Sequence, residues 1–188
     1  MDLSGNWEGF YAYEDMLNSE SLDKHSEEYR RVKISASFEQ SLNVLTGYMR
    51  DIKPEVQTAP FKQHLFQHRK AYGLKNFLAW QKVLFFRPNL EIEHANPLEA
   101  SCNGHVRGDE VFFVKTYAGP STHRYLENGV PLSQAQEPML PVTYQGALSA
   151  DGSLIQGKWS IAPQNALDGT DVPGLGGLFE LRRCPPIC

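Results

Sequence analysis

Lys115 has the most reactive side chain in a strand-like run of aromatic and β-branched residues over 111–117. Alternate residues of a strand point to one face, so Lys115 shares a face with Val111, Phe113 and Tyr117. If that face points inward, the ammonium is buried among aromatic rings and could pair with a ligand carboxylate or act as an amine nucleophile. If the face that carries Phe112 points inward, Lys115 is solvated. Periodicity leaves both orientations open.

The histidines offer acid–base or metal chemistry. His64 and His68 are one helical turn apart and could bind a metal ion from one helix face, but the sequence places no third ligand near them. We therefore expect no metal site and two solvated histidines. His105 lies opposite Phe112 in a predicted hairpin and could serve as an acid, a base or a polar anchor for a ligand. The alternative is an ordinary histidine on the polar face of a sheet.

The three cysteines predict neither a disulfide framework nor a metal site. They are Cys102, Cys184 and Cys188, and an odd number argues against the paired cysteines of a small secreted domain. Cys184 and Cys188 supply too few thiolates for a structural zinc ion, and their three-residue spacer differs from the redox CxxC motif. We expect incidental thiols near a frayed end of the chain.

A predicted hairpin over 142–161 organises the rest of the chain. Asp151 and Gly152 favour a type I′ turn, whose central residues both need a positive φ. The resulting register pairs Leu148 with Ile155, Gly146 with Gly157, Tyr144 with Trp159 and Val142 with Ile161. All four pairs share one face, and polar residues occupy the other, as in a half-buried antiparallel sheet. The facing glycines would leave a gap, which suits a sharp bend or a bound ligand.

Further strands are predicted around this hairpin, over residues 3–13, 31–40, 42–51, 98–106, 111–117, 122–126 and 178–183. Residues 31–40 alternate cleanly between apolar and charged or hydroxyl side chains. Gly108 and Asp109 favour a type II′ turn that places Arg107 opposite Glu110. Residues 133–141 and 163–177 are expected to be loops. Eight or nine short strands with tight turns are typical of an up-and-down barrel or a sandwich.

Residues 54–88 differ from these strands because they are rich in aromatic and basic residues. Phe61, Leu65 and His68 fall at helical spacing, as do Leu74 and Leu78. We expect a short helical insertion that packs as a lid on a barrel end. A mobile gate over a ligand cavity is the alternative.

Composition limits the classes of partner. The chain has 188 residues, with 18 basic against 22 acidic, so its net charge of −4 does not favour nucleic acid. Its apolar runs are short, so we expect no membrane partner. No signal peptide is apparent before Gly5, and a cytoplasmic location is expected.

Two ends of the chain resemble the calycins, the barrel superfamily of lipocalins, fatty-acid-binding proteins and avidins. Gly5, Asn6 and Trp7 resemble the Gly-x-Trp motif of the first calycin strand. The resemblance implies that Arg182 or Arg183, in the last strand, packs across Trp7 and closes the barrel. A guanidinium over an indole is worth up to about 2 kcal/mol when it is desolvated. No residues match a biotin site or a haem site.

The sequence thus predicts an all-β protein, an antiparallel up-and-down barrel of eight to nine strands with a short helical insertion. A single calycin-like domain over 1–188 is expected, with the insertion at about 54–88. The expected function is binding of a small, largely apolar ligand inside the barrel. The alternatives are a barrel enzyme of isomerase, cyclase or chromophore lyase type and a filled barrel that binds a protein. No cofactor and no oligomeric state is predicted. The candidate ligand-binding residues are His105, Phe113, Lys115, Tyr117, Tyr144, Gly146, Ile155, Gly157 and Trp159.

Overall fold

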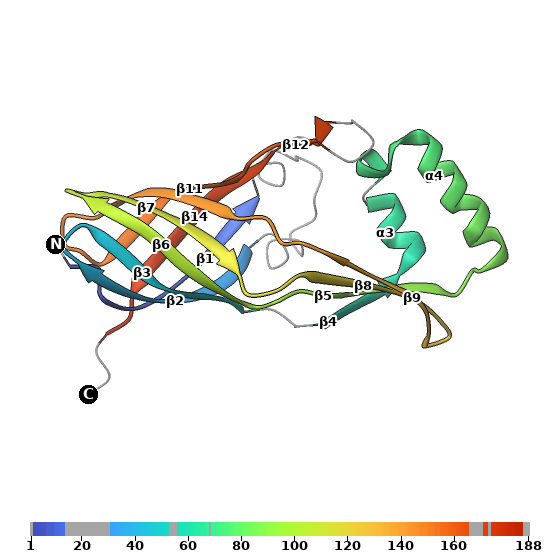
Figure 1. Ribbon diagram of the computed structural model, residues 1–188, viewed down its shortest axis with the longest axis horizontal. Coiled ribbons are helices and arrows are strands. Elements are labelled where there is room, and N and C mark those ends of the chain that lie inside the picture. The colour runs from blue at the N-terminus through green and yellow to red at the C-terminus, as the bar shows by residue number, and fades with distance from the viewer. Residues whose placement is uncertain are drawn as a thin grey trace. The chain divides into compact units, whose positions relative to one another are not determined.

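A computed structural model describes residues 2–13, 31–52, 56–67, 69–165, 171–172 and 174–185 (Figure 1). Its contacts divide the chain into two compact units. Unit 1 comprises Met1–Lys53, Leu98–Ala118 and Leu140–Cys188, and unit 2 comprises Pro54–Pro97 and Gly119–Met139. Unit 2 is thus larger than the expected insertion at 54–88. The single domain over 1–188 stays a prediction.

Unit 1 is a closed antiparallel barrel of eight strands, which confirms the predicted fold class. Around the barrel the order is β1-β14-β11-β10-β7-β6-β3-β2, so strands that follow one another within the unit pair with one another. The bounds are Gly5–Tyr13 for β1, Arg31–Ser41 for β2, Val44–Ile52 for β3, Glu99–Arg107 for β6, Glu110–Tyr117 for β7, Val142–Leu148 for β10, Leu154–Ile161 for β11 and Leu175–Arg183 for β14.

Alternation along these strands builds the barrel core. In β2 the even-numbered residues Ile34, Ala36 and Phe38 are buried, as the sequence pattern predicts. The middle of the interior is aromatic: Phe113 stacks on Tyr144 with ring centroids 4.8 Å apart, and Phe179 meets Tyr144 edge-on at 5.0 Å. Such ring pairs add about 0.5–1.5 kcal/mol each beyond the area they bury.

The two predicted hairpins have the expected register. Tyr144 faces Trp159 and Gly146 faces Gly157 between β10 and β11, and Arg107 faces Glu110 between β6 and β7. The predicted type I′ turn, however, is not present. Only Gly152 in the β10–β11 connection has a positive φ, of 72°.

That connection is a longer loop, which is held by a backbone turn over residues 149–152 together with side-chain hydrogen bonds. The Gly152 N–H donates to the Ser149 carbonyl at 2.9 Å, which closes a turn one residue earlier than predicted. The Asp151 carboxylate accepts hydrogen bonds from the Ser149 hydroxyl and from the Ser153 N–H and hydroxyl. Asp151 therefore keeps a negative φ and satisfies three donors of its own loop.

The gap expected between the facing glycines is filled. A Cβ on Gly157 would lie 2.1 Å from the Gln145 carbonyl oxygen, so the two backbones approach too closely for any larger residue. A Cβ on Gly146 would lie 3.0 Å from Cζ of Phe179. The glycines therefore admit close backbone contact and a phenyl ring rather than leaving open space.

Unit 2 is a four-stranded sheet in the order β4-β5-β8-β9, with two helices. The elements are β4 (Val56–Pro60), α3 (Phe61–Gln67), α4 (Arg69–Phe86), β5 (Leu90–Ala95), β8 (Ser121–Glu127) and β9 (Val130–Glu137). Phe61 and Leu65 of α3 bury against Leu90 and Ile92 of β5, and Trp80, Leu84 and Tyr125 pack around them. The predicted helices are confirmed in part, because the expected insertion opens with a strand.

Two predicted loops contain strands. Residues 133–141 were expected to be a loop, yet β9 runs through Glu137; all of its residues are exposed, so no alternation marks it. Within 163–177, β12 (Gln164–Asn165) pairs with β13 (Asp171–Val172), and β14 begins at Leu175 rather than at residue 178. In the described part of the chain, no helix is both long and apolar enough to cross a membrane.

Candidate functional site

Lys115 points into the barrel and is fully buried. Its Nζ lies 2.5 Å from Oδ1 of Asp51, whose side chain is also fully buried. The structure thus settles the orientation that periodicity left open: the face with Val111, Phe113 and Lys115 is the inner one. The result is an ion pair between two strands inside an aromatic interior.

Two tyrosine hydroxyls lie beside the ion pair and hydrogen-bond to Asp51. Tyr117 donates to Oδ2 at 2.9 Å, and Tyr11 lies at the limit of a hydrogen bond to the same oxygen, at 3.5 Å. The Lys115 Nζ lies 4.4 Å from the centroid of the Tyr117 ring. Asp51, Lys115, Tyr11 and Tyr117 are called the polar cluster below.

Backbone pairing brings the members of the polar cluster together. Asp51 follows Leu45 and Met49 on the inner face of β3, and its N–H donates to the Leu98 carbonyl at 3.0 Å. Lys115 pairs in register with Cys102 of β6. Cys102 in turn pairs with Gly47, four residues before Asp51, so the register alone does not align the two charged side chains. The tilt and stagger of barrel strands offset neighbouring residues along the axis, and the Lys115 ammonium meets a carboxylate 64 residues away in the sequence.

Aromatic rings surround the polar cluster. Trp159 meets Tyr11 edge-on at 5.6 Å and Tyr13 at 4.9 Å between ring centroids. The Trp159 Nε1–H donates to the Ala12 carbonyl at 3.0 Å, so the indole satisfies its own polar group within the wall. The half-buried rings of Tyr13 and Tyr117 also pack against the core.

The tyrosines near Asp51 are held in the neutral form. Burial raises the pKa of Tyr11 and Tyr117 far above the usual value, and the Asp51 carboxylate raises both further. Burial also raises the pKa of Tyr144 well above its usual value. Burial raises the pKa of Tyr13, an effect that a hydrogen bond with Tyr11 opposes. These phenols are thus hydrogen-bond donors rather than bases at neutral pH.

The structure places the other candidate ligand-binding residues at three separate levels or faces. Phe113, Tyr144, Gly146 and Gly157 form the middle of the barrel interior. Ile155 is inward too, but it lies four residues before Trp159 on β11, about 13 Å along the strand. His105 lies on the outer wall, half-buried, with its ring stacked on Phe112 at 5.0 Å. Lys115 and Tyr117 thus meet in the polar cluster, and Trp159 packs on its Tyr11 ring. Tyr144 faces Trp159 in the register and lies close enough to the cluster that its pKa is raised by burial and also by the Asp51 carboxylate.

The sequence did not indicate Asp51, Tyr11 or Tyr13 as site residues. Asp51 lies at the end of a predicted strand. Leu45 and Met49 precede it on the same face of that strand, and this pattern is the one sequence feature that could have indicated an inward Asp51. A carboxylate that continues an apolar face is either solvated beyond the core or buried with a partner. Only the fold identifies Lys115 as that partner.

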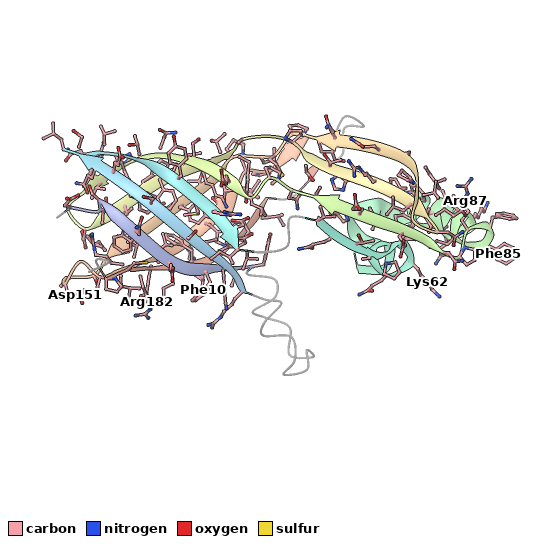
Figure 2. The ribbon with its side chains drawn as sticks, turned by 90° about the horizontal axis from the view of Figure 1, so that it is seen from below. Phe10, Lys62, Phe85, Arg87, Asp151 and Arg182 are labelled. Carbon is pink, nitrogen blue, oxygen red and sulfur yellow. The ribbon has the colours of Figure 1, made fainter. Side chains whose placement is uncertain are left out.

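Arg183 closes the barrel over Trp7. Its guanidinium carbon lies 4.6 Å from the indole centroid, and its nitrogens donate to the carbonyls of Asp2, Ser4 and Gly152. The calycin resemblance implied this contact for Arg182 or Arg183. Arg182 instead points outward and pairs with Glu180 at 2.8 Å (Figure 2).

The remaining histidines and cysteines form no metal site among the described residues, where no three possible ligands lie close enough to share an ion. His68 and Cys188 lie outside the described residues, so the predictions on the 64/68 and 184/188 pairs are not decided. His94 and His123 meet edge-on across β5 and β8, with centroids 4.6 Å apart. Burial raises the pKa of the Cys102 thiol to about 12, although Lys115 lowers it in part.

A surface groove of about 1050 Å³ lies on the outer wall of β1, β2 and β3. Exposed Tyr48 and Arg50 line it, together with Cys184 and Pro185 beyond the last strand. None of the nine candidate ligand-binding residues lines this groove.

Comparisons with known proteins returned no match, whether with models of protein families, with curated proteins or with solved structures.

Proposed function

We propose that unit 1 is a calycin-type barrel that binds a small, largely apolar ligand at the polar cluster. The observation that carries this proposal is the fully buried pair of Lys115 and Asp51 in an otherwise aromatic interior. The closed eight-stranded barrel and the contact of Arg183 with Trp7 support the calycin assignment.

The burial of this ion pair is better explained by function than by stability. Removing two charges from water costs several kcal/mol per ion, and well-packed apolar side chains of similar volume are often about 1–4 kcal/mol more stable. Methionine and leucine would fit beside Tyr11 and Trp159 without that penalty. Clusters of buried ionisable groups are instead common where a protein binds or reacts.

The charges of the polar cluster indicate the chemistry of the ligand. Lys115 is neutralised by Asp51, so an anionic ligand would bring a third, uncompensated charge into the interior. A neutral ligand with one hydroxyl or carbonyl group fits better, because it adds no charge and can hydrogen-bond to the Tyr13 hydroxyl, whereas Tyr117 already donates its proton to Asp51. Phe113, Tyr144 and Phe179 fill the middle of the barrel, so the ligand would lie at the level of Trp159 and Tyr13.

The pairing of Lys115 argues against its use as an amine nucleophile. A carboxylate in contact favours the ammonium form, which has no lone pair to attack a carbonyl. Binding is therefore preferred to the enzyme alternative.

The proposal can be tested with 2-acetylnaphthalene, a neutral aromatic ketone, and with 2-naphthoate, its anionic counterpart. Titration with either compound should quench Trp159 fluorescence. The dissociation constant of the ketone should be at least about ten-fold lower than that of the anion, because the anion brings one unpaired charge into the interior. Trp159→Phe should remove the signal. Native mass spectrometry of freshly purified protein would show a molecule retained from the cell.

Two variants make the binding test specific. The double variant Lys115→Met/Asp51→Leu keeps the interior neutral and should weaken ketone binding at least about five-fold. Lys158→Met makes the same lysine-to-methionine change on the exposed face of β11 and should leave binding unchanged. Unchanged affinity in the double variant, or no retained molecule and no quenching in the unmodified protein, would refute the proposal.

A filled barrel that binds a protein is the second candidate. It is favoured by the complete packing of the middle of the interior and by the groove beside Tyr48 and Arg50. If this candidate is correct, Tyr48→Ser should abolish capture of the partner and leave the fluorescence of Trp159 unaffected.

A further inference from the structure

Basic and acidic residues are unevenly distributed along the chain. Residues 56–90 include six basic residues and no acidic one, whereas the rest of the chain has twelve basic and twenty-two acidic residues. The segment spans both helices of unit 2, α3 and α4. A helical segment with charges of one sign attracts polyanionic partners, although the whole chain is acidic.

The second half of α4 exposes apolar side chains. Trp80 and Leu84 turn inward and pack on the core of unit 2. Phe85 and Phe86 are 82% and 80% exposed, and Leu78 and Val83 are 48% and 36% exposed. We call Leu78, Lys82, Val83, Phe85, Phe86 and Arg87 the α4 tip.

The basic residues of the α4 tip flank its aromatic pair. The rings of Phe85 and Phe86 meet edge-on, 5.4 Å apart, and Lys82 is exposed one helical turn before Phe86. Arg87 forms a 3.4 Å ion pair with Glu127 and remains half exposed. Phe85 and Arg87 project from unit 2 in Figure 2. Two exposed phenylalanines beside cations are unusual for a surface that faces water alone.

We propose that the α4 tip docks on the surface of an anionic lipid bilayer. Phe85 and Phe86 enter the boundary between headgroups and acyl chains, while Lys82 and Arg87 contact lipid phosphates. The helix lies on the membrane and does not span it. The sequence prediction of no membrane partner rested on the lack of a spanning segment, which this peripheral contact does not need.

The residues of the α4 tip favour lipid over other anionic or apolar partners. A symmetric contact with a second copy would place the same basic helix on both sides, and like charges would repel. A single-stranded nucleic acid would stack its bases on Phe85 and Phe86, but Leu78 and Val83 offer no flat ring. A bilayer needs no shape complementarity and accepts aliphatic and aromatic side chains together.

Vesicle flotation with the full chain tests the proposal. The protein should float with vesicles of phosphatidylcholine and phosphatidylserine at a 7:3 ratio, bind pure phosphatidylcholine far less, and dissociate as salt rises. Phe85→Ser/Phe86→Ser should weaken binding at least about ten-fold, because two apolar anchors are lost. Lys82→Glu should weaken it about five-fold or more.

A matched control separates the α4 tip from exposed apolar surface in general. Leu42→Ser/Val44→Ser alters two exposed apolar residues of unit 1 and should leave flotation unchanged. Phe85→Trp should show emission shifted to shorter wavelength when phosphatidylserine vesicles are added. The proposal fails if the unmodified protein does not float, or if Phe85→Ser/Phe86→Ser floats equally well. It also fails if Phe85 and Phe86 are required for dimerisation, measured by sedimentation. The same holds if they are required for binding a labelled oligonucleotide, measured by a gel shift.

Discussion

At the scale of single residues, the interior of unit 1 contains a pair of opposite charges, which meet beside tyrosine hydroxyls. Lys115 donates to Asp51, and Tyr117 donates to the other oxygen of the same carboxylate. Each partner satisfies a charge or a donor that would otherwise be buried without compensation. The cluster is therefore more sensitive to the loss of one member than to the loss of the pair.

Lys115→Met should lower the free energy of unfolding by about 3–5 kcal/mol, because it leaves the Asp51 carboxylate buried without its cation. Adding Asp51→Leu to this variant should restore most of the loss. Lys158→Met, on the outer wall, should change stability by less than about 0.5 kcal/mol. Urea denaturation measures all three. Equal effects of Lys115→Met and Lys158→Met would contradict the buried pair.

Alkaline pH should destabilise the barrel. The pKa values of Tyr11, Tyr13, Tyr117 and Tyr144 are raised by burial in the folded state, whereas unfolded tyrosines ionise near a pH of about 10. Below that pH these phenols are neutral in both states, and their contribution to stability is complete. Above it the unfolded state loses protons that the folded state keeps, so stability falls as pH rises.

Denaturation midpoints between pH 8 and 11.5 would measure this alkaline loss. The midpoint should begin to fall above about pH 8.5, where the Cys102 thiol ionises in the unfolded state but not in the folded one, and should fall more steeply above about pH 9.5 as the tyrosines follow. Tyrosine absorbance at high pH should show these phenols ionising together with unfolding. Ionisation that precedes the loss of β-sheet circular dichroism would indicate that the rings are open to water.

At the scale of elements, β1 and β14 close the barrel, and the two neighbouring arginines of β14 differ sharply in role. Arg183 covers Trp7 and donates to three carbonyls, whereas Arg182 is solvated beside Glu180. The chemistry of the two side chains is identical, so the difference arises from the face of the strand on which each lies.

Arg183→Met should lower the free energy of unfolding by roughly 2 kcal/mol or more, through loss of the cation–π contact and of charged hydrogen bonds. Arg182→Met should cost less than about 0.5 kcal/mol, as expected for an exposed pair. Thermal and urea denaturation of the two variants form the comparison. A larger loss for Arg182→Met would show that Arg183 is not the closing residue.

The elements that the sequence could predict are those with one buried face and a turn signal. The β10–β11 and β6–β7 hairpins have alternating faces, so their register follows once the turn is placed. In β7 both faces carry large apolar residues, which hid the direction of Lys115. β9 has no buried face and therefore no pattern. Asp51 could not be matched with Lys115 because their contact depends on the pairing of β3 with β6, which residues 54–97 separate in the sequence.

At the scale of the whole molecule, unit 2 is inserted between barrel strands that are already neighbours. Residues 54–97 separate β3 from β6, and residues 119–139 separate β7 from β10, yet both strand pairs are hydrogen-bonded. Each insertion therefore replaces what could be an ordinary hairpin turn.

Replacing residues 54–97 and 119–139 with short glycine-containing turns should leave a folded eight-stranded barrel. The shortened chain should keep β-sheet circular dichroism, a cooperative thermal transition and the sensitivity to Lys115→Met. It should lose vesicle flotation, because the α4 tip is removed. A chain in which only residues 119–139 are replaced serves as the control. If the doubly shortened chain is unfolded while this control folds, the barrel requires unit 2.

The position of these insertions also bears on the order in which the barrel is built. Closing a loop of 44 residues rather than a four-residue turn costs about 2 kcal/mol more in chain entropy. The strands β1 to β3 and the β10–β11 hairpin pair with partners that are near in the sequence, so they should form early. The hydrogen bonds between β3 and β6 should form later. Because Asp51 and Lys115 lie on strands that flank β6, their two charges would meet only once the seam between β3 and β6 has formed.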